Sequence, residues 1–334
     1  MRSAVALISS GLDSVLAAKI VSDQGIKVRG ILFYFIFDNL YYKIKNGEID
    51  RILQPLGIPV KKIDLTEKMV KLLQTDPEHG FGSCMNPCID CHIMMLKTAH
   101  GFMKKNQADF LITGEVVGQR AMSQKESILR HIEKSIELKG LVLRPLSAKL
   151  LEETVPEKKG WIDREKLYGI AGRSRKRQLE LAEKLGIKKF STPAGGCILT
   201  DPEFSKRLKV FREKKDKRKV SKEELILMRF GRHFWPRNNL HIIAGRNESE
   251  NNILETFADQ RWVFQPVNVP GPLVLATGIE GEKDIKLAGG IISRYCNKRK
   301  SQSVKVKYVN KEKGISGILD ALPVGEKELE EWRV

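Results

Sequence analysis

Short apolar runs alternate with amphipathic stretches along the first two hundred residues. Residues 5–8, 30–37, 60–65 and 110–113 are runs of strand length with apolar positions, which predict buried strands. Residues 15–20 and 43–57 have apolar positions at helical spacing, and a further helix is expected from Ile93 onward. Strands and helices that alternate in this way predict an α/β domain with a doubly wound parallel sheet. Ligands bind such sheets at the carboxyl ends of the strands.

The pattern changes in the last third of the chain. Residues 160–192 are basic and predicted to be helical, and ten of the seventeen residues from Lys206 to Lys222 are Lys or Arg. Short strand-like segments follow, separated by glycine and proline, at residues 240–245, 262–267, 272–277 and 303–309. We therefore expect a first domain over residues 1–205, a basic linker or helix over residues 206–222, and a smaller α+β domain over residues 223–334.

A polar turn joins the first predicted strand to the first predicted helix. It consists of Ser9, Ser10, Gly11, Leu12, Asp13 and Ser14. A strand, a tight turn and a helix start bring backbone N–H groups and the helix N-terminus toward an anion, and the serines add hydroxyl donors. Gly11 allows the backbone to approach a phosphate closely. The turn lacks the GK[ST] ending of a Walker loop. It predicts a phosphate site; the alternative is an ordinary strand-turn-helix.

Composition and charge narrow the class of protein. The chain has 334 residues, of which 41% are hydrophobic and 30% are charged, as in globular proteins of two or three domains. No apolar run approaches the ~20 residues of a membrane helix, and the start has no signal-peptide pattern. We therefore expect a cytoplasmic protein without a membrane partner. The formal net charge of +18 favours a polyanionic partner.

The five cysteines suggest metal, cluster or catalytic chemistry, because an odd number without a secretion signal does not indicate a disulfide framework. Cys88 and Cys91 form a CxxC pair whose thiolates can reach one metal, and a helix N-terminus would acidify them. Cys84 lies just before this pair. A structural zinc site would need a second pair of ligands. His92 is expected to be a solvated neighbour. Cys197 follows a glycine-rich loop, and a core position is expected for the fifth cysteine, Cys296.

The polar turn resembles the SGGxDS PP-loop of the ATP pyrophosphatase family, with Ser10 in place of the second residue of that pattern. The resemblance implies a PP-loop (HUP-like, Rossmann-like) domain that binds ATP and releases pyrophosphate. It also implies that Mg²⁺ is held mainly by the phosphates and by Asp13, and that Phe33 lines the adenine pocket. The residues implied to bind phosphate are Ser9, Ser10, Gly11, Asp13 and Ser14.

Two further segments resemble PP-loop enzymes that thiolate tRNA. The segment TGEVVGQRAMSQ, with the later LRPL, is similar to the 4-thiouridine synthases (ThiI-like), which implies that Gly114, Gln119 and Gln124 contact the nucleotide. The segment NPCIDCHIMMLK is similar to the 2-thiouridylases (MnmA-like), which implies an essential role for Cys91. In that family a second essential cysteine lies in a loop comparable to that of Cys197.

The segment RFGRHFWPRNNLHIIAGRNESENNIL resembles the NFACT-R module of RNA-associated proteins. The resemblance implies an RNA-binding surface in which Lys305 and Lys307, with the basic residues 298–300, contact phosphate. Phe234 and Trp235 would either stack on bases or lie in the core of the module.

Together the resemblances imply an ATP-dependent tRNA sulfurtransferase, or thiouridine synthase, which adenylates a uridine carbonyl and replaces its oxygen with sulfur. Asp13, Cys91 and Cys197 are the implied catalytic residues. Cys91 and Cys197 could carry a persulfide, or Cys88, Cys91 and Cys197 could hold a [4Fe-4S] cluster, which is slightly favoured; Cys84 is then a spare or alternative ligand.

The expected partners are tRNA and a sulfur donor, either a cysteine desulfurase or inorganic sulfide, and a homodimer is left open. Two other functions remain as alternatives. One is an RNA-binding protein without catalysis, which would not need Asp13 or the CxxC pair. The other is a PP-loop amidotransferase or lysidine-type ligase, which would not need three cysteines.

Overall fold

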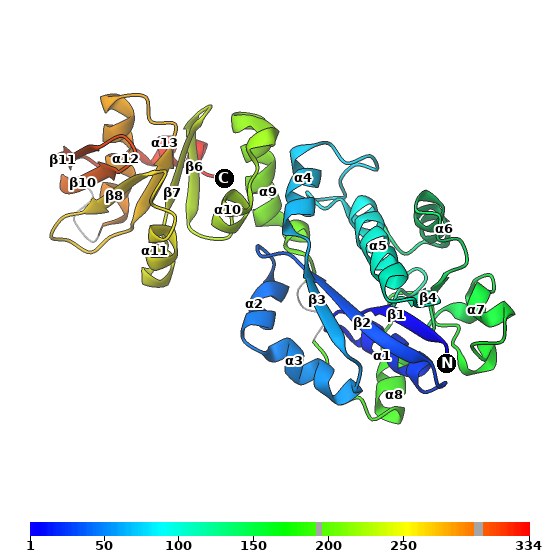
Figure 1. The fold of residues 1–334 in the computed structure, drawn as a ribbon. Coiled ribbons are helices and arrows are strands. Elements are labelled where there is room, and N and C mark those ends of the chain that lie inside the picture. The colour runs from blue at the N-terminus through cyan, green and yellow to red at the C-terminus, as the bar shows by residue number, and fades with distance from the viewer. Residues whose placement is uncertain (192–195, 297–302) are drawn as a thin grey trace. The chain divides into compact units, whose positions relative to one another are not determined.

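The first unit of the chain is built on a parallel sheet. A computed structural model describes residues 1–191, 196–296 and 303–334, which divide into two units, Met1–Thr200 and Asp201–Val334 (Figure 1). The sheet of the first unit has the strand order β3-β2-β1-β4-β5, with every neighbouring pair parallel. The predicted fold class is confirmed. The strands are β1 (Ser3–Leu7), β2 (Lys27–Tyr34), β3 (Val60–Asp64), β4 (Phe110–Ile112) and β5 (Val142–Leu143).

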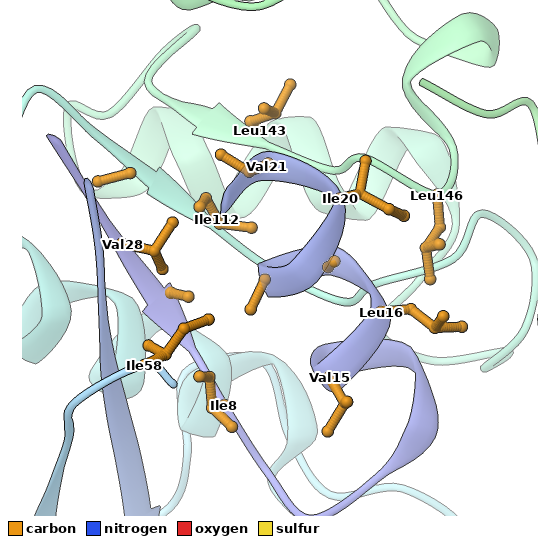
Figure 2. Close-up of a cluster of buried hydrophobic side chains, with 14 of the residues drawn as sticks. Ile8, Val15, Leu16, Ile20, Val21, Val28, Ile58, Ile112, Leu143 and Leu146 are labelled. Carbon is orange, nitrogen blue, oxygen red and sulfur yellow. The ribbon is translucent and has the colours of Figure 1, made fainter. Parts of the chain in front are cut away.

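Helices cover both faces of this sheet because side chains alternate along the central strand. Ala4 and Ala6 of β1 belong to a core that includes α1, α3 and α8. Figure 2 shows part of this core, with Leu16 and Ile20 of α1 and Ile112 of β4. Val5 belongs to a second core, with α5 and α6, on the other face. The helices of this unit are α1 (Leu12–Ser22), α2 (Asn39–Lys45), α3 (Glu48–Leu53), α4 (Thr66–Gln74), α5 (Cys88–Lys105), α6 (Glu126–Ser135), α7 (Val155–Lys158) and α8 (Lys176–Lys184), with short 3-10 turns at Gln54–Leu56, Ala148–Leu150, Arg164–Lys166 and Ile198–Thr200.

Several predicted element boundaries are wrong. Strand β2 begins at Lys27 and ends at Tyr34, so residues 35–37 lie beyond it. The stretch 43–57 is divided into α2, α3 and a 3-10 turn, because Gly47 takes a left-handed φ of 68° between the two α-helices. The stretch 160–192 was predicted to be helical, but among its described residues, 160–191, the α-helix covers residues 176–184. Gly172, with a φ of 85°, interrupts any longer helix before it.

The second unit contains a six-stranded antiparallel sheet of order β11-β10-β8-β9-β7-β6. The sequence pattern predicted four of these strands and missed β6 and β11. Helix α12 packs on the sheet through Ala288, Ile291 and Ile292. The elements are β6 (Arg232–Arg237), β7 (Leu240–Ala244), β8 (Trp262–Pro266), β9 (Val274–Thr277), β10 (Val304–Asn310), β11 (Ile315–Ala321), α9 (Pro202–Phe211), α10 (Lys222–Leu227), α11 (Glu248–Glu255), α12 (Glu282–Tyr295) and α13 (Glu326–Trp332).

The basic segment 206–222 is helical and lies inside the second unit. It covers most of α9, a π-helical turn (Arg212–Asp216), a 3-10 turn (Lys217–Lys219) and the first residue of α10. Lys305 and Lys307 alternate with buried valines on β10 and are exposed. Residues 298–300, which the sequence placed beside them, lie outside the described residues. Within the described residues, every helix is too short or too polar to cross a membrane.

Phe234 and Trp235 lie in the core of the second unit, with exposed fractions of 0% and 2%, so the base-stacking interpretation is wrong. Trp235 stacks on His241, with ring centroids 4.2 Å apart. Nε2 of His241 lies 2.9 Å from Nδ1 of His233, whose Nε2 donates to the carbonyl of Phe230 at 2.9 Å. Burial lowers the pKa of His233 to about 3, and burial also holds the pKa of His241 well below its usual value. Both rings are therefore neutral in the folded unit.

We expect the second unit to lose stability in mild acid. The unfolded histidines take up protons below about pH 6.5, whereas folded His233 does so only near pH 3. The unfolded state therefore binds more protons in this range, and stability falls as the pH decreases from 6.5 toward 3, by about 1.4 kcal/mol per pH unit for each histidine. Urea unfolding followed by tryptophan fluorescence at pH 7 and pH 5 measures this loss.

The variant His241→Gln should show about half of this pH dependence, because one of the two buried rings is removed. The exposed His131 of the first unit provides a control, and His131→Gln should leave the dependence unchanged. Equal stability of the wild-type second unit at pH 7 and pH 5 would contradict two buried neutral rings.

Candidate functional site

A cavity of about 590 Å³ in the first unit brings the predicted site residues together. It lies at the carboxyl ends of β1, β2 and β4, as expected for a parallel sheet. Its lining includes every candidate residue from the sequence: Ser9, Ser10, Gly11, Asp13, Ser14, Phe33, Cys88, Cys91, Gly114, Gln119, Gln124 and Cys197. The structure thus shows that these residues share one cavity, and their roles remain predictions.

Ser14 organises the turn between β1 and α1. This is the polar turn of residues 9–14, which we name the phosphate turn after the phosphate site predicted there. The Oγ of Ser14 accepts a hydrogen bond from the backbone N–H of Ser9 at 3.0 Å and lies 2.9 Å from the carbonyls of Ser9 and Gly11. Helix α1 follows Gly11, and no side chain caps it. The first backbone N–H groups of a helix have no partner within the helix. These groups and the positive end of the helix dipole therefore remain for an anion in the cavity.

Ser10 has a structural role of its own. Ser191 donates to it twice, from Oγ to the hydroxyl of Ser10 at 2.7 Å and from its backbone N–H to the carbonyl of Ser10 at 2.7 Å. These bonds attach the segment that leads toward Cys197 to the phosphate turn. They give a physical reason for a serine at the position where the family pattern has glycine.

Four buried polar atoms beside the turn have no hydrogen-bond partner in the described structure. They are Oδ1 of Asp13, Oε1 of Gln119, Oε1 of Gln124 and Nε of Arg175. The other carboxylate oxygen of Asp13 accepts from Gln119 Nε2 at 3.0 Å and lies 3.8 Å from Nη2 of Arg175. Buried polar atoms without partners cost free energy. Such atoms on a cavity wall therefore suit a polar, charged ligand.

Arg175 was not predicted as a site residue. The basic segment around it was interpreted as facing solvent or RNA phosphate, but Arg175 lines the cavity. A backbone bond from the N–H of Gly172 to the carbonyl of Val117, 2.8 Å long, directs the segment toward the sheet edge. Arg173, two residues before Arg175, is exposed. The local sequence does not indicate which of these two arginines lines the cavity and which is exposed.

Gly114 brings the end of β4 against the phosphate turn. A Cβ at this position would lie 2.4 Å from the backbone nitrogen of Ser14 and 2.5 Å from the carbonyl carbon of Asp13. The resemblance to the 4-thiouridine synthases implied that this glycine contacts the nucleotide, which stays a prediction. Its demonstrable role is to allow two backbone segments of the site to touch.

A buried ion pair forms one wall of the cavity region. Oε2 of Glu115 accepts from Arg144 Nε at 3.0 Å, and Oε1 of Glu115 accepts from His92 Nδ1 at 2.9 Å. Burial by itself would raise the pKa of Glu115, but Arg144 and His92 outweigh burial and lower it to about 2. The prediction that His92 is a solvated neighbour is wrong, because this ring bonds Glu115 and lines the cavity. The motifs TGE and LRPL contained Glu115 and Arg144, but no role was assigned to them.

The cysteine pair lies on a helix rather than in a loop. Helix α5 begins at Cys88, not near Ile93, so Cys88 and Cys91 are three residues apart on its first turn. Cys84 precedes the helix, and its N–H donates to Oδ1 of Asn86 at 3.2 Å; Cys84 is not part of the cavity lining. Cys296 is buried in the second unit, as expected.

The thiols of Cys91 and Cys197 are not acidified. Burial, with the neighbouring Cys88 and Asp38, raises the pKa of the Cys91 thiol to about 12. Burial, with Asp38 and Cys91, also raises the pKa of Cys197 well above its usual value. The predicted effect of the helix N-terminus is therefore outweighed by desolvation and nearby negative charge. Cys88 also contributes to the raised pKa values of both Cys91 and Cys197, so the three sulfurs lie close together.

Asp38 is a further residue that the sequence did not indicate. It lies just beyond β2, and its carboxylate accepts from the N–H of Leu40 at 3.2 Å and from the N–H of Ile198 at 3.1 Å. It therefore caps α2 and fixes the backbone next to Cys197. Asp38 lines the cavity close to the thiols.

These features define the class of the first unit: a PP-loop-type α/β domain with a phosphate turn after β1 and thiols in the same cavity. Residues 1–155 match the family described as Thiamine biosynthesis protein (ThiI). Residues 231–333 match the NFACT protein RNA binding domain, NFACT-R_2. The resemblances of the two segments to the ThiI-like and NFACT-R families are therefore confirmed.

Three of the solved structures that match this chain are 16–20% identical to it. A 4-thiouridine synthetase in complex with RNA and ATP has 20% identity and a TM-score of 0.39, over 67% of this chain and 53% of that one. A predicted subunit of a tRNA methyltransferase from Methanocaldococcus jannaschii has 20% identity and a TM-score of 0.30, over 43% and 69%. The C-terminal part of the fibronectin/fibrinogen-binding protein from Streptococcus suis has 16% identity and a TM-score of 0.27, over 74% and 100%.

The chain thus spans about half the length of the synthetase that it matches. A comparison with curated proteins finds no match.

The contact at Gly114 yields a stability prediction. In Gly114→Ala the new Cβ would overlap the backbone of the phosphate turn, so we expect the free energy of unfolding to decrease by about 1–3 kcal/mol. Gly101→Ala on α5 is the matched control, because a Cβ there meets nothing within 4 Å. This control should be neutral or stabilising by up to about 1 kcal/mol. Chemical unfolding of both variants measures the difference, and equal stabilities would contradict the close approach.

Proposed function

We propose that this chain is an ATP-dependent tRNA sulfurtransferase that adenylates a uridine carbonyl and replaces its oxygen with sulfur. The observation that carries the proposal is one cavity containing both an uncapped phosphate turn and three thiols. The ThiI family match over residues 1–155 and the RNA-binding match over residues 231–333 support the same reaction class.

The cavity fits ATP and Mg²⁺. Its volume of about 590 Å³ lies within the range of ordinary ligand pockets. The phosphates would contact the turn from Ser9 to Ser14 and the N-terminus of α1, and Arg175 would add a positive charge. The unpartnered Oδ1 of Asp13 would hold Mg²⁺. Phe33 would line the adenine side of the cavity.

Uridine is activated because its carbonyl oxygen is a poor leaving group. That oxygen attacks the α-phosphorus of ATP, the bond to the β-phosphate breaks, and pyrophosphate leaves. A sulfur nucleophile then bonds to the activated carbon, the carbon–oxygen bond breaks, and AMP leaves with the former carbonyl oxygen. The protein positions the two substrates and stabilises the phosphate charge.

The source of the sulfur can follow either of two routes. In the first, a persulfide on Cys91 attacks, and Cys197 then breaks the S–S bond and forms a disulfide with Cys91. In the second, Cys88, Cys91 and Cys197 hold a [4Fe-4S] cluster, which would supply an iron position for sulfide. We favour the cluster, because the Cys91 thiol, with a pKa of about 12, is a weak nucleophile, whereas iron would displace its proton.

The proposed RNA partner is tRNA, bound through the second unit. This unit contains the NFACT-type domain, the basic segment 206–222 and the exposed Lys305 and Lys307. A surface of this charge contacts phosphates without reading sequence. The sulfur donor is either a cysteine desulfurase or inorganic sulfide, the proposed location is the cytoplasm, and a homodimer is left open.

The adenylation step is tested by pyrophosphate release in the presence of tRNA. We expect Asp13→Ala to abolish release, because it removes the carboxylate beside the phosphates. Arg175→Ala should lower it at least about tenfold, as expected for loss of one hydrogen bond to a charged group. Arg173→Ala, at an exposed position two residues away, should remain within about twofold of the wild type. Normal release by Asp13→Ala would remove the PP-loop assignment.

The three cavity cysteines should act as one unit in thiolation. Replacing Cys88, Cys91 or Cys197 by alanine should stop sulfur incorporation into tRNA while ATP binding is retained. By the cluster route each variant also loses iron, whereas by the persulfide route Cys88→Ala stays active. Nucleoside mass spectrometry and iron analysis measure both effects.

Cys84→Ala is the control for these cysteine variants. It lies in the same stretch of chain but outside the cavity lining, so we expect wild-type thiolation. Thiolation at the wild-type rate by Cys197→Ala would exclude both routes.

A further inference from the structure

A second group of ligand-type side chains lies in the first unit, apart from the cavity lining. It consists of Glu78 and His79 before α5, Asp90 on the first turn of α5, and His131 on α6. One donor atom from each of Glu78, His79 and Asp90 lies within 4.8 Å of the other two. Nε2 of His79 lies 2.7 Å from Nε2 of His131. Four side chains from three segments therefore converge at one place.

Asp90 fixes the orientation of the His79 ring. Its Oδ2 accepts from the backbone N–H of His79 at 3.1 Å, and its Oδ1 lies 3.1 Å from Nδ1 of the same ring. When Nδ1 carries its proton toward Asp90, Nε2 is left with an unshared electron pair. A carboxylate behind the ring is the usual support of a metal-binding histidine in proteins.

The Nε2 atoms of His79 and His131 face each other, so a metal ion could bind between them in place of the hydrogen that they share. At 2.7 Å, one Nε2 has to donate its hydrogen to the other, and His131 is the donor if His79 is oriented by Asp90. Around a tetrahedral Zn²⁺ with Zn–N distances of about 2.0–2.1 Å, the two nitrogens would be about 3.3 Å apart, so the rings would separate by about 0.6 Å. His131 is exposed on α6, so its side chain has room for this movement.

We propose that His79 and His131, together with the carboxylate of Glu78, bind one divalent transition-metal ion such as Zn²⁺, while Asp90 orients the ring of His79 from behind. Imidazole nitrogen and carboxylate oxygen are ordinary ligands of Zn²⁺, and no cysteine is required. The ion would join the chain before α5, the first turn of α5, and α6. Because Asp90 lies between Cys88 and Cys91, the ion would also steady the helix start that presents the cavity thiols. The site does not depend on the proposed function.

Titration of the untagged full-length chain with Co²⁺ tests this site, because Co²⁺ reports its ligands by absorption. We expect one Co²⁺ per chain to bind without a sulfur-to-cobalt charge-transfer band, in addition to Co²⁺ bound by the cavity thiols. This sulfur-free signal should persist when Cys88, Cys91 and Cys197 are all replaced by serine. His131→Gln should weaken binding at least tenfold, and Asp90→Asn should weaken it about 10- to 100-fold, as for loss of a carboxylate behind a ligating histidine.

His100→Gln is the matched control, because His100 lies on α5 outside the cluster. It should bind Co²⁺ as the wild type does. Saturating Zn²⁺ should raise the unfolding temperature of the wild type and of His100→Gln, but not of His131→Gln. Equal binding by His131→Gln and His100→Gln would overturn the proposal. Loss of every bound Co²⁺ in the triple serine variant would overturn it too.

Discussion

The ion pair between Glu115 and Arg144 holds the carboxyl edge of the parallel sheet together. Glu115 follows β4 and Arg144 follows β5, and their side chains are 10% and 4% exposed. Glu115 also bonds His92 on α5, and Arg144 also bonds Glu133 on α6. One buried pair therefore connects two strands and two helices at the edge where the cavity lies. Removing one partner of such a pair typically costs about 3–5 kcal/mol, because the other charge is left buried.

This ion pair matters more because it positions neighbouring side chains than because it stabilises the fold. A buried ion pair is often no more stabilising than apolar side chains of the same size, since both charges lose their hydration. Apolar residues, however, cannot orient neighbouring polar side chains by hydrogen bonds. Glu115 holds Nδ1 of His92 at 2.9 Å and accepts from Thr113 at 3.0 Å. Because its pKa is lowered to about 2, this carboxylate is charged at neutral and at mildly acidic pH. The cavity wall thus has constant charge and geometry.

Much of the site could be predicted because parallel topology brings strand ends together. Residues from the turn after β1, from β2 and from the loop after β4 line one cavity although they are far apart in sequence. Arg175 and Asp38 could not be predicted, because their position depends on long-range backbone bonds such as that of Gly172 with Val117. The start of α5 was misplaced since the first turn of a helix tolerates polar residues, so apolar spacing begins late. The roles of Phe234 and Trp235 could not be decided from the sequence either, because a strand pattern does not distinguish a core face from a binding face.

The thiols illustrate how burial changes the chemistry that a motif suggests. A CxxC pair at a helix N-terminus would be acidic if it were solvated. Here burial and the charge of Asp38 favour the neutral thiol at Cys91 and at Cys197. A metal cation beside the sulfurs reverses this balance, because it stabilises thiolate where water cannot. The same carboxylate of Asp38 that opposes an isolated thiolate would then attract the cation. Burial and the charge of Asp38 therefore oppose an isolated thiolate at Cys91 and at Cys197, although the CxxC motif by itself suggests one.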